Sequence, residues 1–88
     1  MERPRKLSRV GKSYSVSRMP IVELTGQKRL LIENHLGVLG YSLEEICVKV
    51  DFGCICVKGS DLRILQLSKE QVVICGYVDT IQMFGGGL

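Results

Sequence analysis

Residues 46–58 read ICVKVDFGCICVK, and this stretch decides the fold class. Apolar residues alternate with Cys or Lys on both sides of a short break at Asp51-Phe52-Gly53. An alternation of period two places the apolar side chains on one face of a β-strand and the other side chains on the opposite face. A short break that contains Gly has the length and chemistry of a tight hairpin turn. The stretch therefore predicts two antiparallel strands that share one apolar face.

The same period recurs over most of the chain. Further strands are predicted where Ile, Val and Leu gather, at residues 21–24, 30–32, 62–64 and 72–75. Glycines punctuate these segments, and three of them are expected to shape turns, namely Gly53, Gly59 and Gly76. We therefore predict an all-β domain of about seven or eight short, mainly antiparallel strands. A small sandwich or roll is expected, and a short solenoid is also compatible with the pattern.

The charges divide the chain near residue 18. Residues 1–18 carry six basic groups and one acidic group, a net charge of +5, whereas residues 19–88 carry six basic and eight acidic groups, a net charge of −2. We expect a flexible basic arm at 1–18, a β domain at 19–84 and a flexible Gly-rich tail at 85–88. A solubilising or partner-binding arm is favoured over a nucleic-acid arm, because the arm has no aromatic residue beyond Tyr14 and the domain is acidic.

Size and hydropathy exclude several classes of protein. A chain of 88 residues holds one domain, which leaves no room for an enzyme with its own cofactor domain. The longest apolar run, residues 72–78, is too short for a membrane span, and no apolar stretch follows the basic N-terminus as in a signal peptide. We therefore expect a small cytoplasmic binding or assembly module without a cofactor.

The cysteines have two possible interpretations. Their spacing is C-x6-C-x-C-x18-C, at Cys47, Cys54, Cys56 and Cys75. This spacing lacks the paired C-x2-C knuckles of zinc ribbons, so a metal or redox site is the minor alternative. Cys54 and Cys56 lie about 7 Å apart on one strand face, too far for a disulfide, whereas Cys47 can approach one of them across the hairpin. Four reduced thiols that act as small apolar side chains are the favoured interpretation.

The single histidine, His35, lies in the segment IENHLG at residues 32–37. Beside Glu33 and Asn34 it can be considered as a general base, but no Ser or Cys nucleophile is paired with it in a recognisable motif. The same residues, followed by Gly37, have the chemistry of a turn, because Asn tolerates unusual backbone angles. We favour the turn.

A weak internal repeat appears at an offset of 26 residues. The pattern L-x-x-S-x-E-x-I-x-V of residues 39–48 recurs as L-x-x-S-x-E-x-V-x-I at residues 65–74. In each copy an apolar strand ends at Ser-x-Glu and a second strand begins at once, with the polar residues at the turn. Duplication and chance both remain open, because patterns of period two are degenerate.

The block at residues 31–42, LIENHLGVLGYS, resembles the YabP/YqfC family of sporulation proteins. The similarity continues through Phe52-Gly53, the Leu-Ser-x-Glu of residues 67–70 and the strand pattern of residues 72–81, and it covers roughly residues 20–84. It is closest to the YqfC branch, whose members carry a similar I-E-N-H-x-G signature after a P-x-x-x-L-x-G entry, here Pro20 to Gly26.

The resemblance implies a non-catalytic protein of endospore formation in Firmicutes. Such proteins are made in the mother cell, and the YqfC branch is associated with a membrane-anchored sporulation partner, YqfD. We expect an interaction and turn surface at Glu33, Asn34, His35, Gly37 and Tyr41. A domain this small is marginal alone and has open strand edges, so a protein partner or a second copy is expected. The alternative is a small nucleic-acid-binding β-barrel that uses the basic arm.

Overall fold

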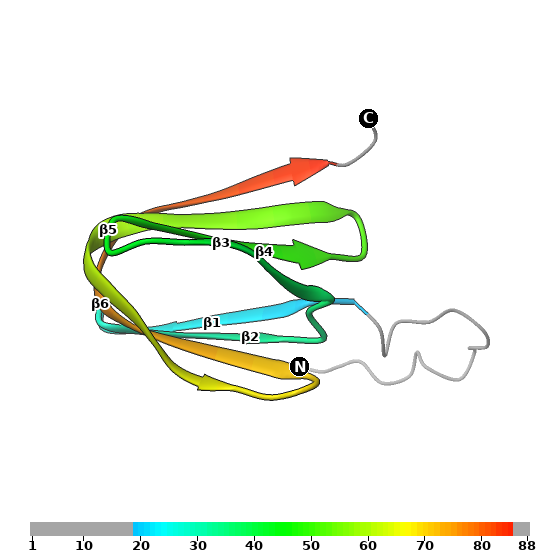
Figure 1. Cartoon of the computed structure of the whole chain (residues 1–88), viewed down its shortest axis with the longest axis horizontal. Coiled ribbons are helices and arrows are strands. Elements are labelled where there is room, and N and C mark those ends of the chain that lie inside the picture. Colours follow the sequence, from blue (N-terminus) through cyan, green and yellow to red (C-terminus); the bar gives the residue numbers. More distant parts are fainter. Residues whose placement is uncertain (1–18, 86–88) are drawn as a thin grey trace, which may run out of the picture.

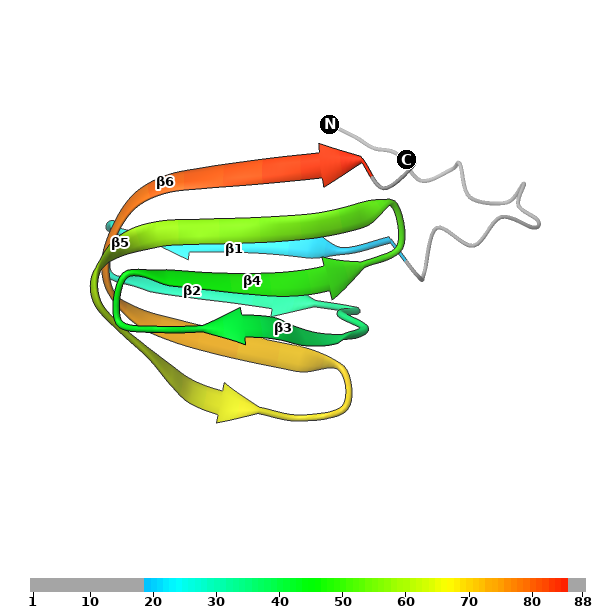
Figure 2. The same ribbon diagram turned by 45° about the horizontal axis from the view of Figure 1, so that its top comes forward.

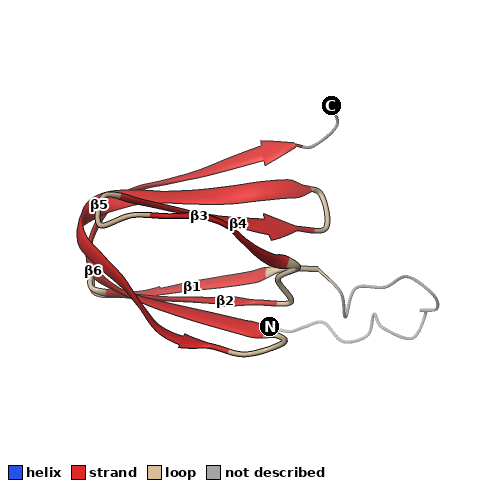
Figure 3. Cartoon of the chain, viewed as in Figure 1, coloured by secondary structure: helices blue, strands red, loops and turns tan. Residues whose placement is uncertain are grey.

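The computed structural model describes residues 19–85, which form one antiparallel sheet with no helix (Figure 3). The six strands are β1 (Ile21–Thr25), β2 (Arg29–Glu33), β3 (Gly37–Tyr41), β4 (Glu45–Val50), β5 (Gly53–Leu67) and β6 (Gln71–Gly85). Their order in the sheet is β1-β2-β6-β5-β4-β3. The predicted all-β fold is confirmed. The expected arm, residues 1–18, lies outside the described residues, as do residues 86–88.

The structure has fewer and longer strands than the seven or eight predicted. β5 and β6 each run for 15 residues and continue through Gly59 and Gly76, where the sequence pattern predicted turns. A Cβ atom on Gly59 would overlap the carbonyl oxygen of Tyr77, and one on Gly76 would lie 2.9 Å from the Cα of Leu62. These glycines therefore let two bent strands approach closely. Gly53, with a φ of 154°, does follow a turn, as predicted.

The bend in β5 and β6 folds the single sheet onto itself as a roll (Figures 1 and 2). The upper layer in Figure 1 consists of β3, β4, the first half of β5 and the second half of β6. The lower layer consists of β1, β2, the first half of β6 and the second half of β5. At the bend the Gly59 N–H donates to the Glu44 carbonyl and the Gly76 N–H donates to the Lys28 carbonyl, each at 3.1 Å.

The core lies between the two layers. In β4 the alternation works as predicted, because Ile46, Val48 and Val50 are buried while Lys49 between them is exposed. Burial of each such side chain contributes about 1.5–3 kcal/mol relative to its exposed state. Residues from both layers share one cluster, made of Leu30, Ile32, Ile46, Val48, Val50, Ile55, Val57, Leu62, Val72, Ile74 and Val78.

The 26-residue repeat corresponds to two hairpins with the same backbone geometry. The turns of the β3–β4 and β5–β6 hairpins lie at corresponding residues, since the first strand ends at 41 or 67 and the second begins at 45 or 71. The Ser42 Oγ accepts a hydrogen bond from the Glu45 N–H, and the Ser68 Oγ accepts one from the Gln71 N–H, both at 3.0 Å. The two turns are thus closed by equivalent serine hydrogen bonds.

Each of these hairpins also carries a β-bulge at the corresponding position. The register shifts between residues 38 and 40 in the first hairpin and between residues 64 and 66 in the second. The extra residue is Leu39 in one and Leu65 in the other, and their side chains are 60% and 62% exposed. The 26-residue repeat is therefore present in the backbone conformation of the two hairpins as well as in their sequences.

Candidate functional site

The segment between β2 and β3 crosses from the lower to the upper layer at the open end of the roll (Figure 1). Its backbone forms hydrogen bonds to both sides of that opening. The Asn34 N–H donates to the Glu70 carbonyl in the β5–β6 turn, and the Leu36 N–H donates to the Lys49 carbonyl in β4, each at 2.7 Å. The crossing is therefore held in one position by the β5–β6 turn on one side and by β4 on the other.

The backbone of this crossing has the turn geometry that the sequence indicated. Asn34 has a φ of 64°, in the left-handed region that Asn tolerates better than most residues. Gly37 has a φ of 134°, which favours glycine. The Asn34 Nδ2 also donates to the Met19 carbonyl at 2.8 Å, which attaches the entry to β1. Asn34 and Gly37 therefore determine the backbone conformation of the crossing.

His35 is the buried residue of the crossing and is only 8% exposed. Its Nε2 lies 2.8 Å from the Ser68 carbonyl oxygen, which can only accept, so Nε2 carries the proton. Its Nδ1 then accepts a hydrogen bond from the Gly37 N–H at 2.9 Å. Because both ring nitrogens are engaged within the fold, the arrangement supports the turn interpretation and not the general base.

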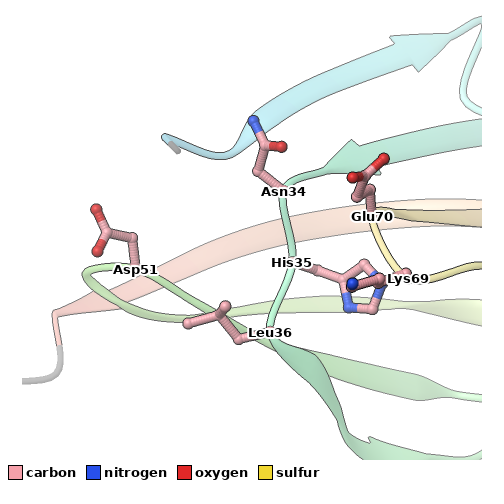
Figure 4. Close-up of a pocket in the computed structure, with 6 residues that line it drawn as sticks. All are labelled: Asn34, His35, Leu36, Asp51, Lys69 and Glu70. Carbon is pink, nitrogen blue, oxygen red and sulfur yellow. The ribbon is translucent and has the colours of Figure 1, made fainter. Parts of the chain in front are cut away.

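An open pocket of about 290 Å³ lies beside the crossing. Three connections contribute to it, those between β2 and β3, β4 and β5, and β5 and β6 (Figure 4). The Leu36 side chain is 58% exposed there. An apolar side chain among amide, carboxylate and ammonium groups suits contact with a polypeptide. The lining residues are Asn34, His35, Leu36, Asp51, Lys69 and Glu70.

The structure brings most, but not all, of the expected surface together. Glu33 ends β2, where its Oε2 accepts a hydrogen bond from the Gln71 Nε2 at 3.2 Å. Tyr41 lies at the far end of β3 from Gly37 and is 57% exposed. Four strand residues span about 13 Å, so Tyr41 is not part of the pocket.

The sequence interpretation missed four lining residues. Leu36 had a detectable signal, because it is a large apolar residue inside an otherwise polar turn. Asp51, Lys69 and Glu70 had none as parts of this site, because they belong to other turns and only the bend of the sheet brings these turns to the same end.

The expectation of four free thiols is wrong for two of them. Cys47 and Cys56 face each other across the β4–β5 hairpin with Cα atoms 4.1 Å apart and form a disulfide, whereas Cys54 and Cys75 are free. The prediction that Cys47 can approach a cysteine across the hairpin, while Cys54 and Cys56 cannot bridge, is confirmed. The physical reason is that directly opposite residues in a non-hydrogen-bonded pair come closest.

The four cysteines do not converge on a metal site. Cys75 lies in the lower layer opposite Arg29 and Arg63. Among the described residues, the ligand atoms that lie within 4.8 Å of one another belong to Glu45, Cys47 and Cys56. Sulfur atoms in a disulfide lack the thiolate charge that binds metal ions, so this set is not a metal site in the state described.

Residues 19–85 contain no helix that is long and apolar enough to cross a membrane. The fold and the pocket together define a small all-β module whose distinctive surface is a rigid turn beside an open pocket.

A model of the YabP family matches residues 17–86, which is most of the chain, and the chain therefore belongs to the YabP family. This is a family of sporulation proteins that are in general not enzymes. No curated protein and no solved structure matches the chain.

Proposed function

We propose that this chain is a non-catalytic assembly module of endospore formation, of the YqfC branch of its family. It binds a membrane-anchored partner of the YqfD type in the mother cell. The observation that carries the proposal is the rigid crossing between β2 and β3, which presents the exposed Leu36 side chain beside an open pocket.

The local contacts explain why this surface suits a protein partner. The Leu36 backbone is held by its hydrogen bond to Lys49, so the backbone needs little ordering when a partner covers the exposed side chain. Burial of a leucine side chain contributes about 1.5–3 kcal/mol. Asp51, Lys69 and Glu70 supply both signs of charge around it, which is the composition of an interface rim.

The remaining surface residues have different parts in the proposal. Asn34, His35 and Gly37 position the crossing, and Glu33 adds a carboxylate at its entry. Tyr41 provides a second, separate contact on β3. In the described chain β1 and β3 end the strand order, so their outer edges have no neighbouring strand and can accept one from a partner.

The nucleic-acid alternative lacks a specific observation in its favour. It depends on residues 1–18, which lie outside the described residues, whereas residues 19–88 have a net charge of −2. Salt-dependent retention on heparin that disappears when residues 1–18 are removed would be required to revive it.

The test is affinity purification of tagged full-length protein from sporulating cells, with Leu36→Glu as the variant and Leu65→Glu as the matched control. Both leucines are more than half exposed, so neither change disturbs the core. We expect Leu36→Glu to lose the membrane-anchored partner and Leu65→Glu to retain it. Equal recovery of the partner with both variants contradicts the proposed surface.

Further variants separate the surface from the family role. Asn34→Ala and His35→Ala are expected to weaken complex formation and spore yield, and removal of residues 1–18 shows whether the arm contributes. If complex formation and sporulation are unchanged in the two alanine variants, the surface is wrong. Expression only in vegetative cells, or occurrence in an organism that never forms spores, contradicts the role itself.

A further inference from the structure

Three of the four cysteines lie on the outward face of the upper layer. Cys47 is on β4, and Cys54 and Cys56 are on β5. The register places Cys47 opposite Cys56 and Lys49 opposite Cys54. Because residues two apart on a strand face the same side, all of these side chains lie on one surface of the hairpin.

We expect the fold to persist when the disulfide between Cys47 and Cys56 is reduced. Neither residue belongs to the core cluster, which uses the alternating positions of the same strands. The pairing of β4 with β5 is set by the register from Glu45↔Lys58 to Val50↔Gly53 and by the apolar face. The two sulfur atoms therefore meet, bonded or not, because the hairpin already brings them together.

The two cysteines differ in their access to solvent. Cys56 is only 6% exposed, whereas Cys47 is half-buried. An incoming reagent therefore reaches the Cys47 Sγ first, and Cys56 is shielded on the neighbouring strand. This is the arrangement of an attacking cysteine beside a resolving cysteine.

We propose that Cys47 and Cys56 form a thiol–disulfide exchange site that reacts reversibly with low-molecular-weight disulfides and thiols. In the oxidising direction the Cys47 thiolate attacks one sulfur of a disulfide RSSR, whose S–S bond breaks as the Cys47–S–S–R bond forms and RS⁻ leaves. The Cys56 thiolate then attacks the Cys47 sulfur and expels the second RS⁻. The two protons of the cysteine thiols end on the two RSH products.

The reverse reaction consumes two RSH and restores both thiols. The net reaction converts RSSR and two cysteine thiols into one protein disulfide and two RSH, so atoms and electrons balance. Cys54 takes no part in the bond, because it lies opposite Lys49 and not opposite Cys47. It is therefore an internal control on the same face.

The test uses full-length protein reduced with dithiothreitol and then equilibrated with defined ratios of glutathione and glutathione disulfide. Remaining thiols are alkylated and counted by mass spectrometry. The reduced protein should show four alkylated cysteines and the oxidised protein two, since Cys54 and Cys75 stay free. A second addition of dithiothreitol should restore four.

Peptide mapping identifies the partner. Trypsin cleaves after Lys49 and Lys58, so Cys47 separates from a peptide that holds both Cys54 and Cys56. The Cys54→Ser variant removes this ambiguity and should retain the link to the Cys47 peptide. The Cys56→Ser variant should lose the link, and Cys75→Ser should leave it unchanged.

The fold must survive both states for the exchange to be reversible. We expect the same far-UV circular dichroism spectrum for reduced and oxidised protein, with a melting temperature higher by on the order of 10 °C when oxidised. Failure of the folded protein to form the Cys47–Cys56 bond, or unfolding of the reduced protein at room temperature, overturns the proposal. Neither measurement requires the sporulation partner, so the proposed function is tested separately.

Discussion

At the scale of single residues, Gly59 lies where the bent strand β5 comes close to the backbone of β6. An alanine Cβ at this position would overlap the backbone of Tyr77, and backbone atoms cannot move aside as a flexible side chain can. We expect Gly59→Ala to lower the free energy of unfolding by about 3 kcal/mol. Urea denaturation measures this change.

The matched control is Gly40→Ala. A Cβ on Gly40 has no atom within 4 Å, and its φ is not in the left-handed region. The change is expected to alter the free energy of unfolding by less than about 1 kcal/mol. Equal effects at residues 40 and 59 would show that the close approach at the bend does not decide stability.

His35 is the second residue on which the fold depends. His35→Ala removes both ring hydrogen bonds, so the Gly37 N–H and the Ser68 carbonyl lose these partners and must form hydrogen bonds with water instead. We expect a loss of about 2 kcal/mol in the free energy of unfolding. Tyr41→Ala, at an exposed position, should cost less and serves as the comparison in the same thermal denaturation series. A smaller loss for His35→Ala than for Tyr41→Ala contradicts this role.

At the scale of elements, the two bulged hairpins are the repeating unit of the molecule. Their turns are closed by equivalent serines, so Ser42→Ala and Ser68→Ala should lower the free energy of unfolding by similar amounts, about 1 kcal/mol each. Ser60→Ala, at an exposed strand position, is the control. Chemical denaturation of the three variants checks this, and a large difference between the two turn variants would contradict their equivalence.

At the scale of the whole molecule, the two layers cannot be separated. β5 and β6 each contribute one half to the upper layer and one half to the lower layer, and one core cluster spans both. We therefore expect the reduced and the oxidised protein each to unfold in one cooperative transition. Calorimetry should give equal calorimetric and van't Hoff enthalpies, whereas two resolved transitions would show that the layers unfold independently.

Much of the fold was predictable from local patterns. The hairpin at residues 46–58 follows from its alternation and its glycine, and the turn at Asn34 follows from the residue types at 33–37. The strand number was not predictable, because Gly59 and Gly76 have the same signature whether they end a strand or bend one. Close approach between distant backbones separates the two cases, and it has no local signal.

The candidate site shows the same division. The sequence identified the crossing around His35, but it grouped Tyr41 with it and missed the pocket residues from other turns, which are Asp51, Lys69 and Glu70. Neighbours along the chain can lie at opposite ends of an extended strand, while turns far apart in sequence can meet at one end of a sheet. The site was therefore predictable as a turn and not as a pocket.

The sequence by itself determined the all-β class, the apolar face of the hairpin at residues 46–58, the turn chemistry at residues 33–37 and the family. These are properties of short segments, since they depend on side-chain alternation and backbone preference within a few residues. The tertiary structure alone decided the strand order, the bend that stacks the two layers, the three turns that line the pocket and the choice of Cys56 as the partner of Cys47. The strand order, the bend and the pocket depend on contacts between segments far apart in the chain, whereas the cysteine pairing depends on the register of the β4–β5 hairpin.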